Sequence, residues 1–78
     1  MTTNRYLTDL EIAHMANAAF IAYEYACDWS AATRAAREYA LDELGVRPSK
    51  SAVLLAVKQA KVSWMKVTMD VKAVVGGL

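Results

Sequence analysis

Cysteine, proline and glycine are scarce in this chain of 78 residues, which contains one Cys, one Pro and three Gly. A single cysteine excludes an intramolecular disulfide and a zinc site built from several thiolates, and it is typical of a reducing compartment. So few turn-forming residues, in a sequence that is 56% hydrophobic, exclude a disordered tail and a turn-rich β-sandwich. The length predicts a single domain over residues 1–78.

The sequence also lacks a long apolar run. Beyond the first residues, the longest stretch without Asp, Glu, Lys or Arg is 12–23, which is twelve residues long. A membrane-spanning helix needs about twenty. The first five residues do not have the basic-then-apolar layout of a signal peptide. We therefore expect a cytoplasmic protein that has no membrane partner.

The formal net charge of +1 conceals a separation of charge along the chain. Residues 1–46 contain three basic and seven acidic residues, a net charge of −4, whereas residues 47–78 contain six basic residues and one acidic residue, a net charge of +5. The mean hydropathy of +0.17 is high for a small domain, because small domains bury a smaller fraction of their surface. We expect a partner or a second copy to cover part of the surface.

Capping signals define the first two predicted helices. Thr8 and Glu11 form a capping box, which predicts a helix over 9–27. Asp28 and Ser30 are both good N-cap residues, and they predict a break before an alanine-rich helix over 30–44. No Gly or Pro enforces this break, so one continuous helix over 9–44 is the alternative.

The third predicted element covers residues 50–75. Gly45 supplies the left-handed residue that ends the preceding helix, and Ser49, directly after Pro48, is the expected N-cap of the next. Polar and apolar residues alternate over 63–75, which is also consistent with a strand that pairs with a second copy. We favour the helix, because no other segment has the pattern of a strand. The predicted fold is a compact all-α domain of three helices.

Apolar residues in 50–75 form a heptad seam with alternating spacings of four and three residues. A second stripe, of Leu55, Val62 and Met69, lies nearly opposite the seam, because two positions correspond to about 200° around a helix. One face is expected to pack on the first two helices, and the other to meet a second protomer or a partner protein. We predict self-association through this helix, most simply as a homodimer. The seam is the predicted surface for self-association, and it consists of Val53, Val57, Ala60, Trp64, Val67, Val71 and Val74.

The residues of catalytic and metal sites are poorly represented. Glu11 and His14 have the Glu-x-x-His spacing of di-iron carboxylate bundles, but the capping box already explains Glu11. Cys27 is 13 residues from His14 on the same predicted helix, too far for a direct hydrogen bond. The sequence has no glycine-rich phosphate loop and no serine elbow. We therefore expect no enzyme, no metal site and no cofactor.

The basic residues near and on the third helix are the predicted contacts for a partner, together with Trp29 at the corner between the first two helices. These features favour a non-catalytic interaction protein of the adaptor or inhibitor type, a class that includes accessory proteins of phages and mobile elements. A helix-turn-helix regulator that binds nucleic acid through residues 41–61 is the first alternative. The second is a binder of small anions or nucleotides at the helix N-terminus over 47–51. The predicted basic contacts are Arg47, Lys50, Lys58, Lys61, Lys66 and Lys72.

The opening segment over residues 5–12, Arg-Tyr-Leu-Thr-Asp-Leu-Glu-Ile, resembles the start of small helical phage proteins that sequester cyclic nucleotides. The resemblance covers about a tenth of the chain. It consists mainly of the capping box, so no site residue follows from it.

Overall fold

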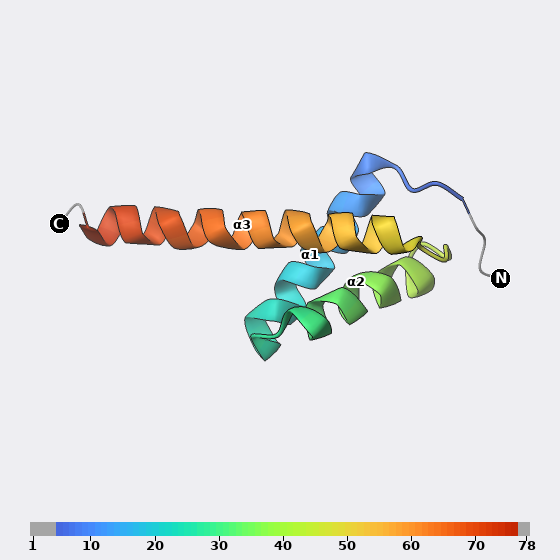
Figure 1. Cartoon of the computed structure of the whole chain (residues 1–78), viewed down its shortest axis with the longest axis horizontal. Helices are drawn as coiled ribbons and strands as arrows, with labels where there is room; N and C mark the ends of the chain where they lie inside the picture. Colours follow the sequence, from blue (N-terminus) through green and yellow to red (C-terminus); the bar gives the residue numbers. More distant parts are fainter. Residues whose placement is uncertain (1–4, 77–78) are drawn as a thin grey trace.

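Three α-helices form the chain in the computed structural model, which describes the backbone of residues 5–76 and the side chains of residues 5–67. The helices are α1 (Asp9–Ala26), α2 (Trp29–Asp42) and α3 (Lys50–Gly76). α1 packs against both other helices, and α3 continues beyond them as a single projecting helix (Figure 1). Within residues 5–76 no segment is a strand, so the all-α prediction is confirmed and the strand alternative over 63–75 is wrong.

The capping box fixes the start of α1. The backbone N–H of Glu11 donates to Thr8 Oγ1 at 3.2 Å, and the N–H of Thr8 donates to Glu11 Oε1 at 2.9 Å. Two of the amides that a helix start leaves unpaired are satisfied in this way. The predicted start at residue 9 is therefore confirmed.

The break between α1 and α2 is also confirmed, and a continuous helix over 9–44 is wrong. Cys27 adopts a left-handed conformation with φ of 53°, and its N–H donates to the carbonyl oxygen of Tyr23 at 2.8 Å. Asp28 then caps α2, because its Oδ1 accepts from the N–H of Ser30 at 3.0 Å. A non-glycine residue thus makes the turn, and the Asp28 cap stabilises the restart.

α2 ends at Asp42, two residues before the predicted end, and Gly45 follows with φ of +64°. Val46 then brings the chain back to the helix bundle. Its side chain is buried, and its backbone N–H donates to the carbonyl oxygen of Ala40 at 3.0 Å. Ser49 caps α3 as predicted, since its Oγ accepts from the N–H of Ala52 at 3.1 Å. α3 covers the predicted range and ends one residue later, at Gly76.

Small side chains dominate the core. The buried residues of α2 are all alanines, and each is fully buried. Because these side chains are small, the backbone of α2 approaches the neighbouring helices closely. Met15 of α1 is the largest fully buried side chain in the cluster where the three helices meet. The buried residues of this cluster are Ile12, Met15, Ala16, Ala19, Ala32, Ala36, Ala40, Val53, Ala56, Val57 and Ala60.

The predicted heptad seam belongs to this internal core over much of its described length. Val53, Val57 and Ala60 are buried within the chain's own helix bundle. These three side chains are therefore not available to a second copy, because the bundle would have to open to expose them. Val67, further along the seam, is exposed, while the side chains of Val71 and Val74 lie outside the described residues. Self-association itself stays a prediction.

Candidate interaction surface

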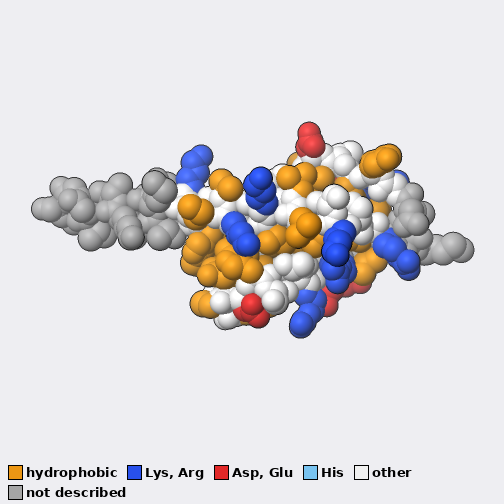
Figure 2. Space-filling model, in the orientation of Figure 1, with side chains coloured by type: hydrophobic (Ala, Val, Ile, Leu, Met, Phe, Trp, Pro, Cys, Tyr) orange, Lys and Arg blue, Asp and Glu red, His pale blue; other side chains and the backbone are white. Residues whose placement is uncertain are grey.

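The side of α3 that faces away from α1 and α2 carries long apolar side chains. With 100° between successive residues, the side opposite Val53 and Ala60 includes six apolar and basic residues that we call the α3 outer face. Three of its apolar members are largely exposed, namely Leu54 (60%), Val62 (57%) and Met65 (61%). Hydrophobic and basic side chains alternate on the surface along this helix (Figure 2). The α3 outer face consists of Leu54, Leu55, Lys58, Val62, Met65 and Lys66.

The charge of this surface is of one sign. From Lys50 to Val67, α3 contains four lysines and no acidic residue. Lys58 and Lys66 are exposed, and within the described side chains neither has an acidic partner, since the one ion pair there joins Arg5 to Glu11. Seven of the eight acidic residues lie on the other helices and their ends, where Glu24, Asp28, Glu38, Asp42 and Glu43 are all exposed, and the side chain of the eighth, Asp70 on α3, lies outside the described residues. The charge separation seen along the sequence is therefore also a separation between helices.

Aromatic side chains join α3 to the corner between α1 and α2. The Tyr23 ring stacks on Trp29 with 3.9 Å between ring centroids, and Trp64 of α3 meets Tyr23 edge-on at 5.0 Å. Phe20 lies 5.5 Å from Trp64, and Lys61 Nζ lies 5.4 Å from the centre of the Trp29 ring. Trp29 and Lys61, both predicted as partner contacts, thus also interact with each other inside the chain.

A groove of about 820 Å³ lies between residues 5–7 and the start of α3. Its walls are mainly apolar, and no acidic residue lines it. Arg47, Lys50 and Ser51, from the predicted 47–51 anion site, are all exposed, and Arg47 and Ser51 line this groove. We call it the α3 N-terminal groove. The side chains that line it include Arg5, Tyr6, Leu7, Arg47, Ala52 and Leu55.

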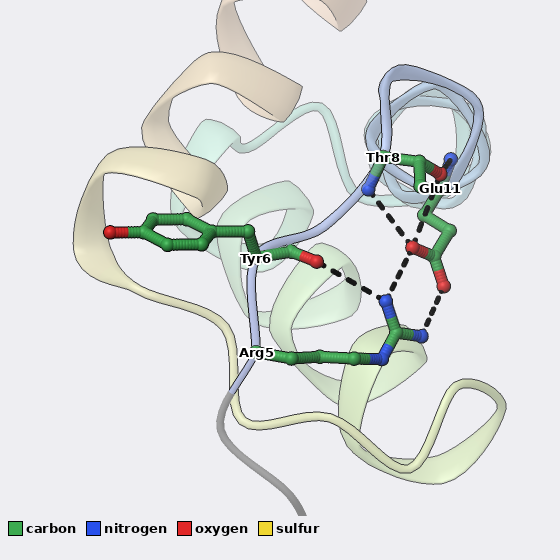
Figure 3. Close-up of polar contacts among 4 residues, drawn as sticks. All are labelled: Arg5, Tyr6, Thr8 and Glu11. Atoms are coloured by element: carbon green, nitrogen blue, oxygen red, sulfur yellow. Dashed lines mark hydrogen bonds and ion pairs between the residues drawn. The ribbon is translucent and has the colours of Figure 1, made fainter.

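An ion pair anchors the N-terminal wall of the groove. Arg5 binds the Glu11 carboxylate in two places, with Nη1 at 2.8 Å from Oε1 and Nη2 at 2.5 Å from Oε2. Figure 3 shows the Tyr6 ring pointing away from this pair, while the Tyr6 carbonyl oxygen accepts a further bond from Arg5 at 3.2 Å. The Arg5 guanidinium and the hydrogen bonds with Thr8 lower the pKa of the Glu11 carboxyl to about 2. The pair also raises the pKa of Arg5.

The structure also shows what the remaining predicted residues do. The Glu11 carboxylate accepts hydrogen bonds from Arg5 and from the backbone N–H of Thr8. His14 is exposed, and 6.4 Å separates the centroid of its ring from that of Tyr39. Within the described residues no group of three or more His, Cys, Asp and Glu side chains could hold a metal ion. The side chain of Lys72 lies outside the described residues.

The groove is the feature that sequence reasoning missed. Leu7 and Ile12 have the spacing of a hydrophobic staple around the capping box, but that pattern does not reveal that residues 5–7 lie beside the start of α3. Arg5 and Glu11 are six residues apart, a spacing that crosses a helix start and matches no regular helical pair.

Comparisons with known proteins add no family to this description. No family model matches the chain, and no curated protein or solved structure shows significant similarity to it. None of the helices, over the residues described, is long and apolar enough to cross a membrane.

Proposed function

We propose that this chain is a non-catalytic interaction protein, and that its α3 outer face binds an acidic surface of a partner protein. The observation that carries the proposal is the exposure of Leu54, Val62 and Met65 on one helix, beside lysines that have no ion-pair partner among the described side chains. Isolated exposed apolar residues are common, but several long apolar side chains exposed on one helix face of a small domain favour an interaction site.

The two kinds of side chain on this face have different roles. Covering a side chain that is about half exposed contributes roughly 1 kcal/mol, half the value for complete burial. The apolar residues therefore supply much of the affinity. Lys58 and Lys66 supply the preference for an acidic surface and accelerate association, because long-range attraction raises the encounter rate and falls with added salt.

Charge reversal on α3 tests the proposal. We expect the purified chain to capture a partner from extracts of its source organism, and Lys58→Glu/Lys66→Glu to abolish that capture. The matched control is Arg34→Glu/Arg37→Glu on α2, where both arginines are exposed and the change in net charge is the same. Lys61 is left intact because it interacts with Trp29. Equal capture by both double variants would refute the role of α3.

The purified partner then separates the contributions of charge and apolar contact. Its dissociation constant should rise with ionic strength for the wild type and much less for Lys58→Gln/Lys66→Gln, which removes the two charges without reversing them. Val62→Ser, which removes the apolar contact without changing the charge, should weaken binding at every salt concentration. A duplex DNA ligand in place of a protein would instead support the helix-turn-helix alternative, with binding that is steeply salt-dependent and insensitive to Val62→Ser.

A second copy of the chain is the alternative occupant of the α3 outer face. Its α1, which contains three acidic residues and neither Lys nor Arg, would complement the lysines of α3. Sedimentation equilibrium at increasing protein concentration measures this directly. A dimer that Val62→Glu dissociates would assign the face to self-association, whereas a monomer at high micromolar concentration would exclude the predicted homodimer.

A further inference from the structure

The α3 N-terminal groove differs in chemistry from the α3 outer face. Its volume, about 820 Å³, falls in the range of small-molecule sites in proteins. Leu7, Ala52 and Leu55 line it with apolar surface, and Arg5 and Arg47 provide its only charges among the described residues. A site of this composition favours a ligand that is itself part apolar and part charged.

The two arginines are not equivalent. Arg5 is neutralised by its two bonds to Glu11, so its guanidinium has little capacity for another anion. Arg47 is exposed and has no ion-pair partner among the described side chains. The groove therefore presents one uncompensated positive charge beside an apolar wall.

We propose that the α3 N-terminal groove binds an organic anion, with its apolar body against Leu7, Ala52 and Leu55 and its acidic head group at Arg47. An inorganic ion would leave the apolar wall exposed to water, and a neutral apolar molecule would leave Arg47 without a partner. Tyr6, whose side chain is 99% exposed on the rim, is free to lie over the bound body. The sequence alone indicated an anion at 47–51 as an alternative, and the apolar wall, to which Leu7 contributes, changes the expected ligand class.

The dye 8-anilinonaphthalene-1-sulfonate is a direct probe, because it combines an aromatic body with a sulfonate and fluoresces when its environment becomes apolar. We expect the folded chain to bind one dye molecule saturably. Arg47→Gln should weaken that binding at least tenfold, the equivalent of about 1.4 kcal/mol. Ala52→Phe, which fills the groove, should abolish it. Circular dichroism confirms that each variant retains its helices.

Matched controls separate this groove from the α3 outer face. Arg34→Gln removes an equally exposed arginine from α2, and Leu54→Ser removes an exposed apolar residue that does not line the groove. Neither should change the dye affinity. If Leu54→Ser weakens binding as much as Arg47→Gln does, or if Arg47→Gln and Ala52→Phe leave it unchanged, the proposal is overturned. Absence of dye binding at millimolar concentration would also overturn it.

Competition then identifies the kind of body that the groove prefers. Displacement of the dye by decanoate indicates a ligand with an aliphatic body, and displacement by 1-naphthyl phosphate indicates a ligand with an aromatic body. Either result supports the proposal. This test is independent of the proposed protein partner, because Lys58→Glu/Lys66→Glu should abolish partner capture and leave dye binding intact.

Discussion

Met15 is the residue whose truncation tests the core most directly. It is the largest fully buried side chain of the helix cluster, with 0% of its surface exposed. Met→Ala at a buried position costs about 2–5 kcal/mol, as lost transfer free energy plus the cavity that remains. The surrounding side chains are mostly alanines, which have no flexible atoms with which to fill a cavity. We therefore expect Met15→Ala to cost about 3 kcal/mol.

That loss is large for a chain of this length. At roughly 0.05–0.15 kcal/mol per residue, the whole domain is stable by about 4–12 kcal/mol. In a small domain each kcal/mol lowers Tm by about 4–8 °C, so Met15→Ala should lower Tm by about 12–24 °C. Thermal unfolding followed by circular dichroism at 222 nm measures this shift.

Met65→Ala is the matched control. The chemical change is identical, but Met65 is 61% exposed on α3, so its truncation should change the free energy of unfolding by less than about 0.5 kcal/mol. A similar fall in Tm for both variants would mean that the two methionines have similar surroundings, and a fall of less than about 4 °C for Met15→Ala would refute the assigned core.

Substitutions at three further positions test the turns and the ion pair. Gly45→Ala should cost about 1–2 kcal/mol in chemical denaturation, because φ is +64° there, and Gly45→Asn should cost less; equal stability of all three would refute a left-handed residue 45. Asp28→Ala should lower stability by about 1 kcal/mol through loss of the α2 cap, whereas Asp28→Ser should retain most of it. Arg5→Gln should destabilise the fold at neutral pH, with the difference from wild type disappearing as the pH falls from about 4.5 to about 2. The ordinary pKa of Glu11 is 4.5 and its folded value is about 2, so the wild type loses this stabilisation across that interval. A difference that persists in urea titrations below that interval would contradict this assignment.

Leu55 links the two surfaces of α3. It belongs to the outer face and also lines the N-terminal groove. A partner protein on the outer face therefore lies next to a ligand in the groove. Leu55→Ser should weaken both partner capture and dye binding, whereas Val62→Glu should affect the partner alone.

Capping residues made the helix boundaries predictable from the sequence. Thr8, Asp28 and Ser49 each accept from a backbone amide within three residues, so the information that starts each helix lies next to it in the chain. The end of α2 was predicted two residues too late. Its position depends on Val46, which is buried and bonds back to Ala40, and burial is a property of the assembled bundle.

The candidate surfaces were less predictable, because a repeat along a helix does not say what each face contacts. The sequence predicted two apolar stripes and assigned the heptad seam to a second copy. The structure buries Val53, Val57 and Ala60 of that seam against α1 and α2, and leaves Val62 of the other stripe exposed. Either stripe satisfied the periodicity, and only the position of the other two helices distinguished them.

By itself, then, the sequence determined the all-α fold, the three helices and the concentration of positive charge on the third. Each of these depends on contacts between residues that are close in the chain, or on composition. The tertiary structure decided which face of α3 meets the core, and it placed residues 5–7 beside Arg47 to form a groove. Those contacts join residues about forty positions apart, and local patterns of capping and periodicity do not encode them.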